Sequence, residues 1–337
     1  MFADLVLEGG GVKGIALVGA VSVLEERGYE FRRVAGTSAG AIIGSLVATG
    51  AGAAELQEIM QGVDYTRFQD GSRWTDLFVG KAVELLLEHG IYDGRYLKEW
   101  LDGQLGKLGV HTFADLPYDD PERPPDPDHA YRLVVMTSDI SQGRLRRLPW
   151  EYRHYGLPGA GQWVADAVRA SMSIPFFYKP AHLKDLDGKD CWLVDGGMLS
   201  NFPIDVFDAP AGVEPRWPTF GIKLSAHPGA ALGTVNDVHD TVSMSWAMLN
   251  TLTGFYDRMH IYDAAVSART IVVDTGTVKV TDFRLDRDTQ DMLFRKGREA
   301  ATKFLDGAPG QPAWDWEAYK LTHRSSQPPT VSAAARR

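Results

Sequence analysis

The sequence has 337 residues, of which 44% are hydrophobic and 23% are charged, the balance found in ordinary soluble globular proteins. Its formal net charge is −9 at pH 7 and its basic residues are dense only at residues 144–147, which argues against a nucleic-acid-binding protein. The longest apolar stretches, such as residues 15–24, fall far short of the roughly 20 residues that a membrane span requires. We therefore expect no transmembrane helix.

The N-terminus and the single cysteine bear on the cellular compartment. No basic segment precedes the first apolar run, so the N-terminus lacks the form of a secretory signal and we expect a cytoplasmic location. Cys191 is the one cysteine, which excludes an intramolecular disulfide and a cysteine-based metal cluster. It lies in an apolar run and is predicted to be a small buried side chain. For residues 144–147 we expect a solvated strand edge or loop, with contact to phosphate headgroups as the alternative.

The first 50 residues alternate between strand, glycine turn and helix. A short apolar run at residues 5–8 ends in glycines, and residues 15–26 then carry apolar residues at helical spacing. Residues 31–35 predict a second strand, and residues 39–48 a helix of small residues that can pack closely on a sheet. Such alternation predicts parallel strands, and ligands of parallel sheets bind at the carboxyl ends of the strands, where both glycine turns fall.

The rest of the chain continues this pattern after a mainly helical stretch at residues 53–108 and a proline-rich, acidic loop at residues 117–129. The alternation resumes after the loop, which favours one continuous domain. We therefore predict the α/β class, with three α/β/α layers around a mostly parallel sheet. The further predicted elements are helices at residues 77–87, 96–101 and 163–171, and strands at residues 131–137, 191–194, 219–224 and 270–273.

The second glycine turn fits the G-x-S-x-G pattern of a nucleophile elbow. Gly36, Thr37, Ala39 and Gly40 flank Ser38, and small neighbours are needed because the serine backbone is strained and packed tightly. The turn lies between a strand and a helix, as the elbow requires. The alternative is a serine that caps the helix N-terminus.

The first glycine turn reads as a cradle for a negative oxygen. It comprises Gly9, Gly10, Gly11, Val12, Lys13 and Gly14, whose backbone N–H groups and following helix dipole suit an oxyanion. The spacing Gly9, Gly11, Gly14 also fits a dinucleotide-binding loop, which wants an acidic residue at the end of the second strand. That strand ends instead at the predicted elbow.

A serine nucleophile needs a base, and Asp195 follows the predicted strand at residues 191–194. Gly196 and Gly197 let the backbone turn at once and leave space beside the carboxylate. The alternative is an aspartate in an ordinary turn before glycine. An unperturbed aspartate has a pKa near 3.9, so a role as base at neutral pH requires an environment that raises its pKa.

The segments GGGVKG, GTSAG and DGG, in this order, resemble the patatin-like phospholipases. The resemblance implies Ser38 as nucleophile, Asp195 as general base and residues 9–14 as oxyanion hole, with Gly10 and Gly11 as the N–H donors. Two further stretches, residues 169–177 and 197–203, also match the family. We expect one patatin-like domain at residues 1–324, with the motif-bearing core at 5–207, a less similar part at 208–324, and a disordered tail at 325–337.

The resemblance implies a lipid acyl hydrolase that cleaves esters of phospholipids, lysophospholipids or acylglycerols through an acyl-enzyme. An acyltransferase with the same dyad, a dinucleotide-binding protein and a catalytically silent lipid-binding protein are the alternatives. A Ser-Asp-His triad is the rival site. Its candidate histidines are His227, His239 and His260.

No metal and no cofactor is implied, since no His, Asp and Glu cluster has ligand spacing. The expected partners are a lipid or ester substrate and, transiently, a membrane surface, whereas an activating protein is left open. A set of apolar residues could face a lipid surface, but the favoured interpretation is that most of them are core residues of a helix that covers the sheet. These residues are Trp74, Leu77, Phe78, Leu85, Leu86 and Leu87.

Overall fold

The computed structural model describes residues 1–68, 92–118, 129–210, 213–224, 263–278 and 282–323, together with residues 120, 247, 251 and 280. Within this part of the chain one sheet of eight strands forms the centre. The strands are β1 Phe2–Leu7, β2 Glu30–Thr37, β3 Leu133–Asp139, β4 Arg144–Leu148, β5 Ala181–Lys184, β6 Asp190–Asp195, β7 Thr219–Lys223 and β8 Thr270–Val272.

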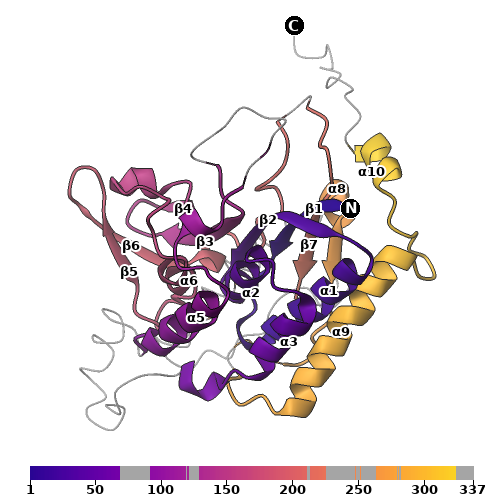
Figure 1. Ribbon diagram of the computed structural model, residues 1–337, viewed down its shortest axis with the longest axis horizontal. Coiled ribbons are helices and arrows are strands. Elements are labelled where there is room, and N and C mark those ends of the chain that lie inside the picture. Colours follow the sequence, from indigo (N-terminus) through magenta and orange to yellow (C-terminus); the bar gives the residue numbers. More distant parts are fainter. Residues whose placement is uncertain are drawn as a thin grey trace, which may run out of the picture.

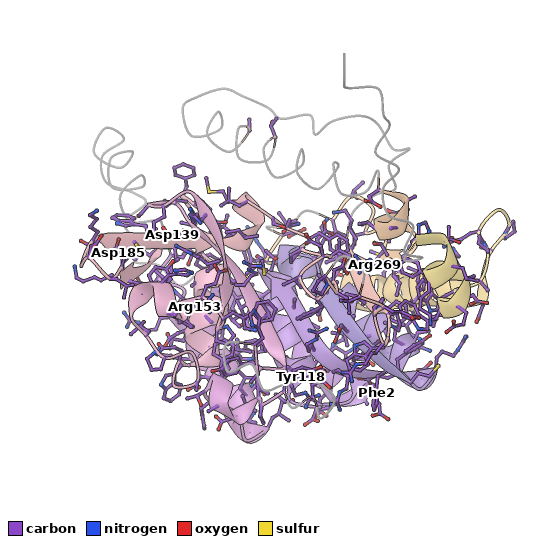
Figure 2. All side chains as sticks on the ribbon, turned by 90° about the horizontal axis from the view of Figure 1, so that it is seen from above. Phe2, Tyr118, Asp139, Arg153, Asp185 and Arg269 are labelled. Atoms are coloured by element: carbon purple, nitrogen blue, oxygen red, sulfur yellow. The ribbon has the colours of Figure 1, made fainter. Side chains whose placement is uncertain are left out.

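The sheet is mostly parallel, as predicted. Its order is β5-β6-β3-β2-β1-β7-β8, with β4 paired to β3. The pairs β1–β2, β1–β7, β2–β3 and β7–β8 are parallel, whereas β3–β4, β3–β6 and β5–β6 are antiparallel. The strand predicted at residues 191–194 is part of β6 and is therefore antiparallel to β3. Figure 2 shows the breadth of the sheet, with Asp139 and Asp185 at the β5–β6 side and Arg269 at the opposite side.

Most of the helices cover one face of the sheet and lie together in front of it in Figure 1. The helices α1 and α2 are buried on almost every side, because nearly all their residues are apolar or small. The helices are α1 Gly14–Glu26, α2 Ala39–Ala48, α3 Ala53–Gln61, α5 Arg95–Lys107, α6 Val164–Ser171, α8 Ala264–Ser267, α9 Arg287–Asp306 and α10 Trp316–His323. Short 3-10 turns are η1 Gly11–Lys13, η2 Tyr65–Phe68, η3 Phe113–Asp115, η4 Tyr152–Tyr155 and η5 Gly196–Met198.

The other face of the sheet carries a smaller hydrophobic cluster. Its side chains include Val6, Ala35 and Val134 from the strands, with Phe202 and Val266 packed over them. Val266 belongs to α8, so this layer closes the α/β/α arrangement within the described residues.

The long helix α9, which the sequence analysis did not predict, packs directly on α1. A Cβ atom on Gly19 would lie 2.1 Å from the carbonyl oxygen of Phe294, and one on Gly297 would lie 2.0 Å from that of Ala16. The two helix backbones therefore approach each other at paired glycines. Arg298 adds hydrogen bonds to Ser22 and Glu26.

The basic run at residues 144–147 forms most of β4, but the expectation of a solvated edge is wrong for Arg146. This side chain is buried, hydrogen-bonds to Gln142 and lies beside Asp139. It was missed because a basic run in a sequence gives no sign of buried acidic partners. Cys191 is buried, as predicted.

Several predicted segments lie outside the described residues. They are the helix at residues 77–87 with its apolar set, most of the loop at residues 117–129, and the tail at residues 325–337. None of the helices within the described residues is long and apolar enough to cross a membrane.

Candidate active site

The strand register brings the two glycine turns and the Asp-Gly-Gly turn together. Leu7 at the end of β1 pairs with Gly36 of β2, and Thr37 pairs with Met136 of β3. The next residue of β3, Thr137, pairs with Asp195 at the end of β6. Three segments that are far apart in the sequence therefore meet at one end of the sheet.

Ser38 occupies the sharp turn between β2 and α2 that the elbow pattern predicts. Its φ of 53° and ψ of −124° are unusual for a residue with a side chain. The turn is crowded, since a Cβ atom on Gly36 would lie 2.2 Å from the carbonyl oxygen of Gly40, and one on Gly40 would lie 2.3 Å from that of Leu7. Ser38 stands at the N-cap position, but its side chain makes no capping hydrogen bond. The helix-cap alternative is therefore wrong.

Asp195 lies beside Ser38 in a buried position. The residue is 7% exposed, and its Oδ1 accepts a hydrogen bond of 2.7 Å from the Gly197 N–H group. Burial raises the pKa of Asp195 to about 6, although hydrogen bonds from Ser38 and Gly197 favour the charged form. The environment that a base at neutral pH requires is thus present.

Two residues at the C-terminal end of α6, Ser171 and Met172, also contact Ser38. The site motifs of the sequence analysis did not include them. The Ser38 N–H group donates to Ser171 Oγ at 2.9 Å, and Ser38 Oγ lies 3.3 Å from Met172 Sδ. A hydroxyl has one proton, and a carboxylate is a much stronger acceptor than a thioether. Asp195 is therefore the preferred partner of that proton when its carboxylate is charged. The matching stretch at residues 169–177 was the available signal.

Two backbone N–H groups of the glycine loop form no hydrogen bond with a backbone carbonyl of the described residues. Gly9 donates to the Asn201 carbonyl at 3.2 Å and Val12 to the Val280 carbonyl at 3.2 Å, while Lys13 and Gly14 donate within the loop. The N–H groups of Gly10 and Gly11 have no backbone acceptor among the described residues. Gly11 has a φ of +55°, and a Cβ atom there would lie 2.0 Å from the Val280 carbonyl oxygen.

Asn201, in the segment that follows the Asp-Gly-Gly turn, forms hydrogen bonds with the glycine loop. Its side-chain amide donates to the Gly9 carbonyl at 3.1 Å, and its own carbonyl accepts from Gly9. A Cβ atom on Gly9 would lie 2.2 Å from Asn201 Oδ1 and 3.1 Å from Ser38 Cβ. Gly9 therefore contacts both Ser38 and the segment that follows the Asp-Gly-Gly turn.

A buried ion pair supports the loop from the β7 side. The Glu8 carboxylate accepts hydrogen bonds from Lys223 Nζ and from the Leu224 N–H group, and both charged side chains are almost fully buried. Leu224 in turn packs against Gly10, where a Cβ atom would lie 2.5 Å from Leu224 Cδ1. The sequence analysis missed this pair, because its partners lie far apart in the sequence.

The alternatives to the dyad find little support. Within the described residues no histidine hydrogen-bonds to Ser38 or Asp195, and the triad candidates His227, His239 and His260 lie outside those residues. The strand β2 ends at Thr37, so the acidic residue of a dinucleotide site is missing from its end. Among the described residues no group of His, Cys, Asp and Glu side chains is placed to hold a metal ion.

The site motifs lie inside a segment that matches a known family. The family model described as "Patatin-like phospholipase" matches residues 5–208. The chain belongs to the patatin-like phospholipase family. Membership confirms the resemblance and supports a lipid acyl hydrolase, an enzyme that cleaves ester bonds.

Relatives of this patatin-like phospholipase differ in length. It is 33% identical to the uncharacterized protein YqhO of Bacillus subtilis, over 90% of this chain and 98% of that protein. It is 26% identical to the uncharacterized NTE family protein Rv1063c of Mycobacterium tuberculosis, over 75% of this chain and 57% of that protein. The mouse patatin-like phospholipase domain-containing protein 6 is 25% identical over 77% of this chain, which spans 16% of the mouse protein.

A solved structure shares the fold. VipD from Legionella pneumophila has a TM-score of 0.51 with this chain and 18% sequence identity. The match covers 89% of this chain and 66% of VipD. Together with the family match, this likeness confirms the patatin-like fold predicted from the sequence.

Proposed function

We propose that this patatin-like phospholipase hydrolyses carboxylic esters of lipids through a Ser38 acyl-enzyme, with Asp195 as general base. The observation that carries the proposal is the contact between a strained, uncapped serine and a buried carboxylate whose pKa is raised to about 6. Ser38 lies close enough to Asp195 to favour its charged form, and a nucleophile within reach of a base is the minimum that nucleophilic catalysis needs.

The first half of the reaction forms the acyl-enzyme. Asp195 accepts the Ser38 proton while Ser38 Oγ bonds to the ester carbonyl carbon, and negative charge moves to the carbonyl oxygen. The bond to the leaving oxygen then breaks, and the proton on Asp195 passes to that oxygen as the alcohol departs. In the second half a water molecule gives its proton to Asp195 and attacks the acyl group, and Ser38 recovers its proton as the fatty acid leaves.

The glycine loop stabilises the oxyanion in this scheme. Gly10 and Gly11 are the assigned donors, because their N–H groups are not used by backbone carbonyls of the described residues. Gly9, Val12, Lys13 and Gly14 shape the loop instead. Removal of one oxyanion-hole donor typically costs a hundredfold or more in turnover.

Separate replacement of the two dyad residues tests the proposal. We expect S38A to lose at least about a thousandfold of kcat on p-nitrophenyl and phospholipid esters, and D195N to lose about a hundredfold or more. A fluorophosphonate probe should label Ser38 in the wild type. The matched control is S45A, which removes a buried hydroxyl of α2 whose hydrogen bond, among the described residues, goes to the Ile42 carbonyl.

The controls separate chemistry from folding. S45A is expected to keep wild-type activity and probe labelling. Activity that persists in either S38A or D195N would contradict the dyad. Product analysis with an added acceptor alcohol would reveal acyl transfer in place of hydrolysis, since both reactions share the acyl-enzyme.

A further inference from the structure

An apolar cavity begins beside the nucleophile. It is bordered by Gly11 of the glycine loop and Ala39 of α2, which directly follows Ser38. Most of the remaining wall is apolar and aromatic, with Tyr65 of η2 and Trp100 of α5 among its side chains. Its volume is about 20 Å³, which is room for about one water-sized group. An extended acyl chain does not fit in this space.

Met172 contacts both the nucleophile and this cavity. Its sulfur lies 3.3 Å from Ser38 Oγ, and its side chain also lines the cavity. The side chain is 4% exposed and follows the last residue of α6, whose position is fixed by contacts with β3, β6 and α2. A chain bonded to Ser38 that extends into the cavity must therefore pass Met172.

Methionine is suited to a site that changes its volume. Its side chain is unbranched, has three rotatable bonds and adapts to irregular spaces more readily than leucine or isoleucine. Met172 is buried here, with its sulfur beside Ser38 Oγ and its side chain on the cavity wall. Gly11 and Ala39 have almost no side chain, and Tyr65 and Trp100 are rigid rings. Met60 of α3 lines the same cavity with the same freedom, but Met172 is the methionine whose sulfur contacts Ser38 Oγ.

We propose that Met172 is a specificity-determining residue that sets how long an acyl chain the site accepts. This inference rests on the proposed function of Ser38. The apolar cavity takes the acyl part of the ester, and the thioether side chain must move aside as the chain lengthens. A shorter side chain at position 172 would leave that space open from the start.

The test compares acyl chains of different length in variants of one residue. In M172A the ratio of kcat/KM for p-nitrophenyl octanoate to that for p-nitrophenyl acetate should rise about tenfold or more, because single methylene groups in apolar pockets change this parameter about 10- to 200-fold. The matched control is M172L, which keeps the volume and apolar character and should change the ratio less than about threefold. Alkyl fluorophosphonates of short and long chain give a second readout, the rate of Ser38 labelling, which does not require turnover.

The outcomes discriminate between this inference and the proposed function. If M172A does not fold by circular dichroism, M172V serves in its place and should shift the ratio in the same direction. An unchanged ratio in a folded, active M172A or M172V overturns the role of Met172 while Ser38 chemistry stands. A wild-type protein that hydrolyses neither ester and is not labelled at Ser38 overturns the proposed function itself.

Discussion

Asp195 is buried at an electrostatic cost. Burial disfavours its charged form, and interactions with Ser38 and with the Gly197 N–H group offset part of that cost. The resulting pKa of about 6 lies close to neutral pH, where a general base is most effective. A carboxylate can therefore do here what histidine does in many serine hydrolases.

The pH dependence of activity follows from this pKa. Because only the ionised form of Asp195 accepts the Ser38 proton, kcat/KM should fall about tenfold per pH unit below pH 6 and level off above it. Measurement of kcat/KM for a p-nitrophenyl ester between pH 4.5 and pH 8 checks this, with the product followed at a pH-independent wavelength. A midpoint near pH 4 would show that the Asp195 pKa is not raised.

At the scale of elements, the turn between β2 and α2 depends on close backbone contacts. Gly40 lies against the carbonyl oxygens of Leu7 and Glu8, at 2.3 and 2.6 Å from an added Cβ atom. Real Cβ atoms do not approach backbone oxygens this closely, so a side chain there must push β1 away from α2. The glycine loop follows β1 directly, so a shift of that strand also moves the N–H groups proposed as oxyanion donors.

A Gly40→Ala substitution should therefore lower the free energy of unfolding by more than about 2 kcal/mol and reduce kcat strongly. The matched control is Gly103→Ala in the middle of α5, where an added Cβ atom meets nothing within 4 Å. That substitution should stabilise the protein by up to about 1 kcal/mol, since alanine is the better helix former. Urea denaturation of both variants checks this, and equal effects would refute the steric argument.

The elements that the sequence predicted well are those with strong local patterns. Residues 15–26 and 39–48 are helical, and residues 31–35 lie within β2, because apolar spacing and glycine turns there mark both ends. The hairpin strand β5, with alternating half-buried and exposed residues, and the amphipathic helix α9 were not predicted. The antiparallel direction of β6 was also not predicted, since direction depends on the path of the chain and not on composition.

In the site, too, features with a local sequence pattern were predicted and long-range contacts were not. Ser38, Asp195 and the glycine loop were predicted as site residues because short motifs carry them. The contacts of Met172 with Ser38, of Asn201 with Gly9, and of Glu8 with Lys223 join segments that are distant in the sequence. No local pattern encodes such contacts, so they had to be read from the structure.

At the scale of the whole molecule, the family match ends at residue 208, before the sheet is complete. The strand β7 pairs with β1, and α9 packs on α1 through the paired glycines Gly19 and Gly297. Lys223 and Leu224, at the end of β7, bind Glu8 next to the glycine loop. Residues 5–208, which carry the motifs, are therefore packed against and stabilised by the part of the chain after residue 208.

A fragment of residues 1–208 should consequently fail to fold on its own. Without β7 and α9, the strand β1 loses one neighbour, α1 exposes an apolar face, and Glu8 is left buried without its cation or freed into solvent. We expect the fragment to aggregate or to lack a cooperative thermal transition by circular dichroism, whereas the full chain shows one. A fragment that melts cooperatively and labels with fluorophosphonate would contradict this expectation.

The strand pairings of Thr37 with Met136 and of Thr137 with Asp195 have a practical use. A slip of one residue in either pairing would turn Asp195 or Ser38 to the opposite face of the sheet and separate them. Covalent labelling of Ser38 in a refolding or expression experiment would then count only molecules whose strands β2, β3 and β6 have found their proper register. Labelling of Ser38 would thus measure the fraction of correctly folded molecules.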